Sequence, residues 1–127
     1  MKVILVDAVD TFVIEGQGIF EEMHELLETY PNRKIILSGA NDEEIVQFGL
    51  ENLPYEMFTL KHNPEKTNPE YFKLLLKHFN LVSKDVIYFE HNIRAVESAG
   101  SIGIIAYHYD SNKKDLAALR KFIDANL

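Results

Sequence analysis

The sequence has 127 residues, of which 46% are hydrophobic and 26% charged, and its formal net charge is −7. This length and composition predict one packed domain spanning residues 1–127 and exclude a disordered chain. The acidic balance argues against nonspecific nucleic-acid binding, and the lack of cysteine excludes disulfides, thiolate metal sites and a cysteine nucleophile. Because no export signal and no apolar run of about 18 residues is visible, we expect a cytoplasmic protein without a membrane span.

Short apolar runs alternate with helical segments in the first half of the chain. Strands are predicted over residues 3–6, a continuous β-branched run, and over residues 34–38, with a weaker strand near residues 56–60. Helices are predicted from Ile19 to Leu27 and over residues 42–52, because apolar residues recur there at helical spacing. Asn41 and Glu44 have the capping-box spacing that begins the second helix.

The second half of the chain continues the same alternation. Asn68 and Pro69 are typical of a helix start, and the helix that follows extends to about residue 79. Strands are predicted over residues 86–89 and 102–106, with a short helix between them that ends at Gly100 and a terminal helix within residues 113–127. The whole pattern predicts an α/β, three-layer Rossmann-like fold, with a five-stranded parallel sheet and helices on both faces.

Polar residues follow four of the predicted strands. Asp7 ends the first strand, Ser38 the second and Glu90 the fourth, and Lys61 and Lys66 follow the third. Ligands of open parallel sheets bind at the carboxyl ends of the strands, where two carboxylates, a hydroxyl and a lysine can support phosphoryl transfer. Each residue alone is as readily explained by capping or by solvent exposure, so only the set indicates a site. The sequence leaves open which lysine faces it.

The order of these residues resembles the haloacid dehalogenase superfamily over most of the chain. Residues 6–11, Val-Asp-Ala-Val-Asp-Thr, are similar to the first family motif, an apolar strand followed by Asp-x-Asp-x-Thr. Asp7 matches the nucleophile of this motif and Thr11 its threonine. Residues 35–39 are similar to the second motif, an apolar strand that ends in Ser or Thr. Residues 66–72 are similar to the third, Lys-Pro-Asp-Pro-Glu-x-Phe, and residues 86–92 to the fourth.

The resemblance implies a phosphatase-type hydrolase that forms a phosphorylated aspartate. Catalytic roles fall on Asp7, Ser38 and Lys66. Substrate-binding roles fall on Thr11, Gly39 and Asn92. A magnesium ion would be held by Asp7, the backbone carbonyl of Val9 and Glu90.

Two positions depart from the family pattern. The family has a second acid at the position of Val9, which protonates the leaving group and then activates water. Asp10 is no direct substitute, because consecutive side chains of an extended segment point to opposite sides. General acid–base catalysis contributes roughly 10²–10⁴-fold, so we expect a slow enzyme or none.

His91 stands where the family has another carboxylate. Because magnesium prefers oxygen ligands, His91 should weaken its binding, and we expect it to cap a helix or face solvent.

The spacing of the first three motifs leaves no room for an inserted cap domain. A capless site is open to water, which favours a macromolecular phosphorylated substrate or a lid supplied by a partner subunit of a homo-oligomer, and disfavours dehalogenation. Two functions remain open: a magnesium-dependent phosphatase of low activity, or a catalytically silent module (a pseudoenzyme) that binds a phosphorylated ligand or a protein partner. A phosphoreceiver domain is disfavoured, because residues 59–62, Thr-Leu-Lys-His, offer no acceptor aspartate after the third strand.

Overall fold

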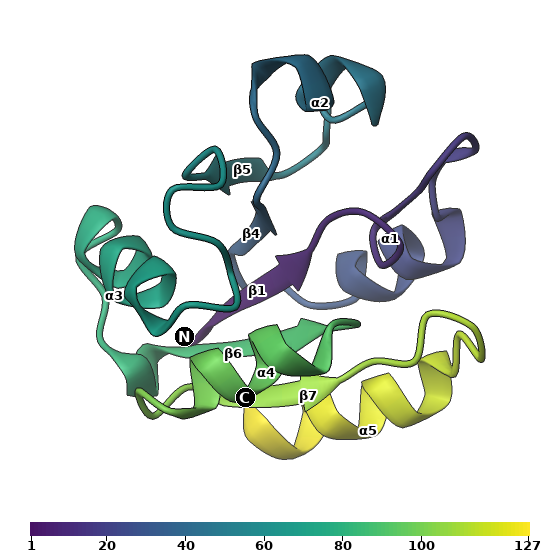
Figure 1. Ribbon diagram of the computed structural model, residues 1–127. Coiled ribbons are helices and arrows are strands. Elements are labelled where there is room, and N and C mark those ends of the chain that lie inside the picture. Colours follow the sequence, from purple (N-terminus) through teal and green to yellow (C-terminus); the bar gives the residue numbers. More distant parts are fainter.

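A central parallel sheet organises the computed structural model, which describes all residues 1–127. Its strands are β1 (Val3–Asp7), β4 (Lys34–Ser38), β5 (Glu56–Thr59), β6 (Val86–Glu90) and β7 (Ile105–His108). They lie in the order β5-β4-β1-β6-β7, with β1 in the middle (Figure 1). Counted along the chain this order is 3-2-1-4-5, as in Rossmann-like folds, whereas receiver domains have 2-1-3-4-5. The predicted fold class is therefore confirmed, and the topology rules out the receiver alternative.

The register of the central strands brings the polar strand ends together. Asp7 pairs with Leu37 of β4, so Ser38 lies one position further along the same edge. The residues that precede Asp7 and Glu90 pair with each other, so these two carboxylates end neighbouring strands at the same level. Adjacent strands are about 4.8 Å apart, and the two side chains are within reach of one shared partner.

Helices cover both faces of the sheet, as Figure 1 shows. On one face α1 (Glu21–Glu28) and α5 (Leu116–Asn126) pack on a core that includes Met23, Leu27 and Leu119. On the other face α3 (Pro69–His78) and α4 (Ile93–Gly100) pack on a core that includes Tyr71 and Phe72. Successive residues of β1 alternate between the two cores, because side chains of a strand point to opposite faces. The fifth α-helix, α2 (Asp42–Gln47), follows β4.

A small hairpin after β1 was not predicted. Strands β2 (Val13–Ile14) and β3 (Gly18–Ile19) pair antiparallel, so Ile19 belongs to the hairpin and α1 begins two residues later, at Glu21. Strands of two residues are too short for a periodic pattern to show. Gly16 and Gly18, both with positive φ, allow the tight reversal between them.

Three other element boundaries differ from the prediction. Helix α2 ends five residues early, because Gly49 takes a positive φ and the amide of Leu50 closes the helix on the carbonyl of Ile45. Strand β7 begins three residues late, because a turn through Gly103, also at positive φ, intervenes after α4. Helix α5 begins at Leu116, where the Asp115 side chain accepts from the third amide of the helix.

The segments between the first three motifs contain only elements already named. The hairpin and α1 lie between β1 and β4, and α2 and β5 lie between Ser38 and Lys66. The two chain ends lie close together, since Lys2 Nζ donates to the carbonyl of Asn126 at 2.7 Å. No helix combines the length and the apolar character needed to cross a membrane.

One buried tyrosine connects the helical layer to the strand end that carries Ser38. The hydroxyl of Tyr71, which is fully buried, donates to the carbonyl of Ser38 at 2.7 Å and lies 3.3 Å from that of Phe58. We expect Tyr71→Phe to lower the free energy of unfolding by about 1–2 kcal/mol, because buried carbonyls lose their donor. Urea unfolding followed by circular dichroism measures this.

Tyr109→Phe is the matched control. Tyr109 is equally buried, but its hydroxyl has no hydrogen-bond partner in the protein, so the substitution should leave stability unchanged or raise it. Equal losses in the two variants would show that the Tyr71 hydroxyl has no special role.

Candidate functional site

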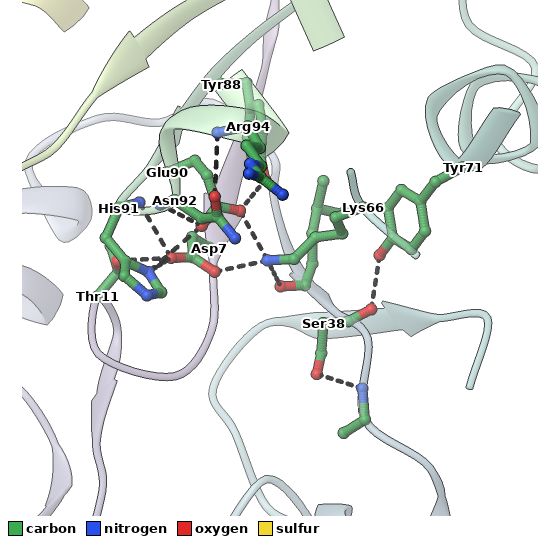
Figure 2. Close-up of polar contacts among 12 residues, drawn as sticks. Asp7, Thr11, Ser38, Lys66, Tyr71, Tyr88, Glu90, His91, Asn92 and Arg94 are labelled. Carbon is green, nitrogen blue, oxygen red and sulfur yellow. Dashed lines mark hydrogen bonds and ion pairs between the residues drawn. The ribbon is translucent and has the colours of Figure 1, made fainter. Parts of the chain in front are cut away.

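Asp7 is the centre of a buried polar cluster at the carboxyl end of β1 (Figure 2). Only 1% of the residue is exposed. Thr11 Oγ1 donates to Asp7 Oδ2 at 2.7 Å, and Lys66 Nζ donates to Oδ1 at 2.6 Å. His91 contributes its backbone amide, 3.3 Å from Oδ2, and its ring Nδ1, which also contacts Oδ2. Both carboxylate oxygens of Asp7 are therefore held by the protein.

Lys66 joins the two carboxylates of the site. Its Nζ lies 2.7 Å from Glu90 Oε1 as well as 2.6 Å from Asp7, and 3.4 Å from the carbonyl of Leu37. The loop between β5 and α3 delivers it. Lys61 instead forms an exposed ion pair with Asp42, with an N–O distance of 3.0 Å. The structure thus answers which lysine faces the site.

Glu90 is fully buried at the end of β6. Its Oε1 accepts from the Tyr88 hydroxyl as well as from Lys66, and its Oε2 accepts from the backbone amide of Asn92 at 3.1 Å. His91 Nδ1 lies 3.3 Å from Oε2. Burying a carboxylate is costly unless it is paired and hydrogen-bonded, and these contacts meet that condition.

The charges of the cluster stabilise one another. Burial by itself raises the pKa of Asp7, but Lys66 and His91 outweigh it and hold the pKa well below its usual range. Burial also opposes the charge of Lys66, yet Asp7 and Glu90 raise its pKa. Hydrogen bonds to Asp7 and Glu90 raise the pKa of His91 to about 10. Near neutral pH the nucleophile candidate is therefore an anion between two cations.

His91 differs from its prediction. It neither caps α4 nor simply faces solvent, because its ring turns inward to Asp7 and Glu90. The cap is Asn92, whose side chain accepts from the amide of Arg94 at 3.0 Å. A histidine next to two buried carboxylates forms strong charge-assisted hydrogen bonds, which outweigh the gain from hydration.

Ser38 and Gly39 form a turn beside Asp7. Ser38 Oγ accepts from the amide of Ala40 at 2.9 Å, while its carbonyl accepts from Tyr71. A Cβ added at Gly39 would lie 3.4 Å from a Glu65 carboxylate oxygen, an ordinary van der Waals contact, so Glu65 lies next to the turn. These contacts fix the turn without using the Ser38 hydroxyl hydrogen, which stays free to donate.

A pocket of about 230 Å³ opens above this cluster. Its lining includes most of the predicted site residues: Asp7, Val9, Ser38, Gly39, Lys66 and Asn92. Thr11 and Glu90 are the exceptions, because both are buried. The Thr11 hydroxyl donates to Asp7, and Glu90 lies beneath the pocket in contact with Lys66. The contact that the structure shows for Thr11 is thus one that positions Asp7, and its substrate-binding role stays a prediction. The catalytic and binding roles of the others remain predictions.

The pocket rim contains a group that the sequence analysis missed. His62 Nδ1 lies 2.8 Å from Glu65 Oε1, and its Nε2 contacts Glu44. All three residues line the pocket, together with Phe48 and Thr67. Glu44 comes from α2 and His62 from the β5–α3 loop, so no local pattern could have joined them. Only the capping-box role of Glu44, which the structure confirms, was visible in the sequence.

Potential metal ligands also gather here. Donor atoms of Asp7, Glu90 and His91 lie within 4.8 Å of one another. The two carboxylates are the hard oxygen ligands that magnesium prefers, so the donor chemistry fits this ion. The imidazole of His91 is a ligand more typical of transition metals.

The raised pKa of His91 predicts a pH-dependent contribution to stability. A group whose pKa is raised by folding stabilises the protein fully below its unfolded pKa, about 6.5, and this contribution is lost as pH rises through the folded value of about 10. We expect the stability difference between wild type and His91→Asn to shrink between about pH 6.5 and pH 10. Urea unfolding at several pH values measures it, and a difference independent of pH would contradict the ion pair.

Comparisons with known proteins place this geometry in a known fold. The sequence matches no protein-family model and no curated protein sequence. Among solved structures, an uncharacterized protein from Corynebacterium glutamicum superposes with a TM-score of 0.62 at 13% identity, covering 98% of this chain and 96% of that one. The core domain of a candidate phosphoglycolate phosphatase from Streptococcus pneumoniae gives 0.60 at 18% identity, with 97% and 95% covered.

A conserved haloacid dehalogenase-like protein of unknown function from Agrobacterium tumefaciens is also similar. Its TM-score is 0.56 at 15% identity, covering 84% of this chain and 61% of that one. Identities this low show only a shared fold, so the chemistry has to be inferred from the residues of the site. The resemblance seen in the motif order is confirmed at that level: the chain has the haloacid dehalogenase-like fold.

Proposed function

We propose that the chain is a phosphohydrolase of low activity, with Asp7 as the nucleophile. The observation that carries the proposal is the contact of one lysine ammonium with Asp7 and Glu90 beside a pocket lined by Ser38 and Gly39. This arrangement keeps the Asp7 carboxylate ionised and in place, and provides positive charge where the oxygens of a phosphoryl group would lie.

The reaction has two steps. A carboxylate oxygen of Asp7 attacks phosphorus, the bond from phosphorus to the leaving oxygen breaks, and the phosphoryl group is transferred to Asp7. Water then attacks the same phosphorus, which releases inorganic phosphate and restores the carboxylate. Lys66 and the hydroxyl of Ser38 would hold the phosphoryl oxygens during both steps.

Val9 limits both steps. It lines the pocket where the family places its second acid, and its side chain cannot donate or accept a proton. The leaving oxygen must take its proton from water, and the water of the second step has no base from that position. Good leaving groups, such as aryl or acyl phosphates, are therefore the substrates expected to react.

The same proposal includes magnesium, as a weakly bound cofactor. When bound, it would neutralise charge on the phosphoryl oxygens, held by Asp7, the carbonyl of Val9 and Glu90. The two carboxylates suit the ion, but the ring of His91 lies between them.

The pocket suggests the kind of substrate. It is small, and its rim residue His62 is about 40% exposed at the side chain, so a phosphoryl group can enter while the rest of the ligand stays outside. We propose a phosphorylated macromolecule, or a smaller ligand covered by a second copy of the chain.

The second candidate function is a silent module that binds a phosphorylated ligand. The observation that favours it is again Val9, in a site that otherwise keeps its lysine, hydroxyl and pocket. Binding of inorganic phosphate without turnover, lost in Lys66→Ala, would support this alternative.

Restoring the acid tests the hydrolase proposal. We expect weak activity of the wild type on aryl and acyl phosphates, none in Asp7→Asn, and a gain of up to about 10²-fold in Val9→Asp, the low end for general acid–base catalysis. Val9→Asn is the matched control, because it has nearly the same shape but no titratable group. Phosphate release with magnesium, over a panel of phosphate esters, is the measurement. If the wild type and Val9→Asp are both inert, the hydrolase proposal is wrong and the binding function is favoured.

A further inference from the structure

Every carboxylate oxygen of the site already has a partner in the protein. Asp7 Oδ1 and Glu90 Oε1 share Lys66 Nζ, at 2.6 and 2.7 Å. Asp7 Oδ2 accepts from Thr11, and Glu90 Oε2 from the amide of Asn92. No oxygen of either carboxylate is left without a donor.

His91 fills the second gap between the two carboxylates. Its Nδ1 contacts Asp7 Oδ2 and lies 3.3 Å from Glu90 Oε2. Lys66 therefore bridges one pair of oxygens and His91 the other, as the dashed lines between the labelled residues in Figure 2 illustrate for Asp7. A magnesium ion shared by Asp7 Oδ2 and Glu90 Oε2 would need both oxygens at about 2.0–2.1 Å, so the ion and the ring nitrogen could not occupy this gap together.

The backbone of His91 is fixed while its ring has a route outward. The amide of His91 lies 3.3 Å from Asp7 Oδ2, and its carbonyl is 2.9 Å from His108 Nε2. The side chain is nevertheless 32% exposed and lines the pocket. Rotation of the ring toward the pocket would open the gap without moving β6 or α4.

We propose that His91 is a built-in substitute for the metal: its imidazole occupies the gap between Asp7 and Glu90, so that the imidazole and a divalent cation bind there in competition. The inference rests on the proposed function in one respect: that Asp7 and Glu90 are the carboxylates that would hold the metal. It makes the metal-free arrangement a complete, hydrogen-bonded state of the site. It also adds occupancy to ligand preference as a reason why we expect magnesium to bind weakly.

Removing the ring tests the competition. Manganese, which replaces magnesium at oxygen-rich sites, is the probe, and electron paramagnetic resonance counts the free ion at constant pH. We expect His91→Ala to bind manganese at least about tenfold more tightly than the wild type, because the cation no longer displaces a hydrogen bond to a charged group. His62→Ala, at the pocket rim but without contact to either carboxylate, is the matched control and should bind as the wild type does.

The alternative role of His91 gives the opposite result. If the imidazole is a metal ligand, His91→Ala should bind manganese more weakly than the wild type, and this would overturn the proposal. Equal affinity, or no binding by either protein, would overturn it too, because His91 would then not be the obstacle. The double variant Asp7→Asn with His91→Ala should lose the gain, which places the bound ion at this carboxylate.

A second measurement covers the case in which His91→Ala does not fold. In the wild type, nuclear magnetic resonance of the imidazole should show the hydrogen-bonded Nδ1 proton of His91 disappearing as magnesium is added to saturation, while the His62 ring signals stay unchanged. Persistence of that proton at saturating magnesium would contradict competition. Failure of the proposed function is separable, because it appears as absent turnover whether or not the cation binds.

Discussion

The buried bridge from Lys66 to Asp7 and Glu90 is the interaction on which the rest of the site depends. Two carboxylates end neighbouring strands in the middle of the sheet, both almost without exposure. Two buried carboxylates repel each other and lose their hydration, so they are stable only with a positive charge within hydrogen-bond distance. The loop before α3 must therefore reach over the end of β4 to bring the ammonium group into place. This requirement links the sheet order, the loop and the pocket.

The site supports two parts of the proposed chemistry unequally: the placement of a charged nucleophile and the transfer of protons. Charge and position are intact, because Asp7 is ionised, held by Thr11 and neutralised by Lys66. In the proposed reaction proton transfer is the weak part, because Val9 has no titratable group. We therefore expect the site to bind and receive a phosphoryl group better than it releases one. In the proposed competition His91 also weakens the binding of a cation, because its ring already contacts both carboxylates.

Much of the fold followed from the sequence for clear physical reasons. Buried parallel strands are continuous apolar runs, and a polar residue at the end of such a run marks the edge where ligands bind. Asp7, Ser38 and Glu90 were located in this way, and the structure brings them to one edge. Helix α3 was equally clear, because Asn68 and Pro69 give it a distinct start.

The parts that escaped prediction depend on contacts between distant segments. Nothing next to His91 in the sequence shows that its ring turns toward Asp7, 84 positions away. The rim of Glu44, His62 and Glu65 joins α2 to a loop, and the hairpin β2–β3 is too short for a periodic signal. The ends of α2 and β7 depended on glycines whose positive φ is a property of the folded chain.

The most direct test of the central claim is whether Asp7 accepts a phosphoryl group. The protein would be incubated with an acyl phosphate, quenched in acid, and examined by intact-mass spectrometry followed by peptide mapping. The account predicts that a fraction of the protein gains the mass of one phosphoryl group, that the modified peptide contains Asp7, and that the adduct decays more slowly in the wild type than in Val9→Asp. A wild type that stays unmodified, or one modified equally in Asp7→Asn, would contradict it.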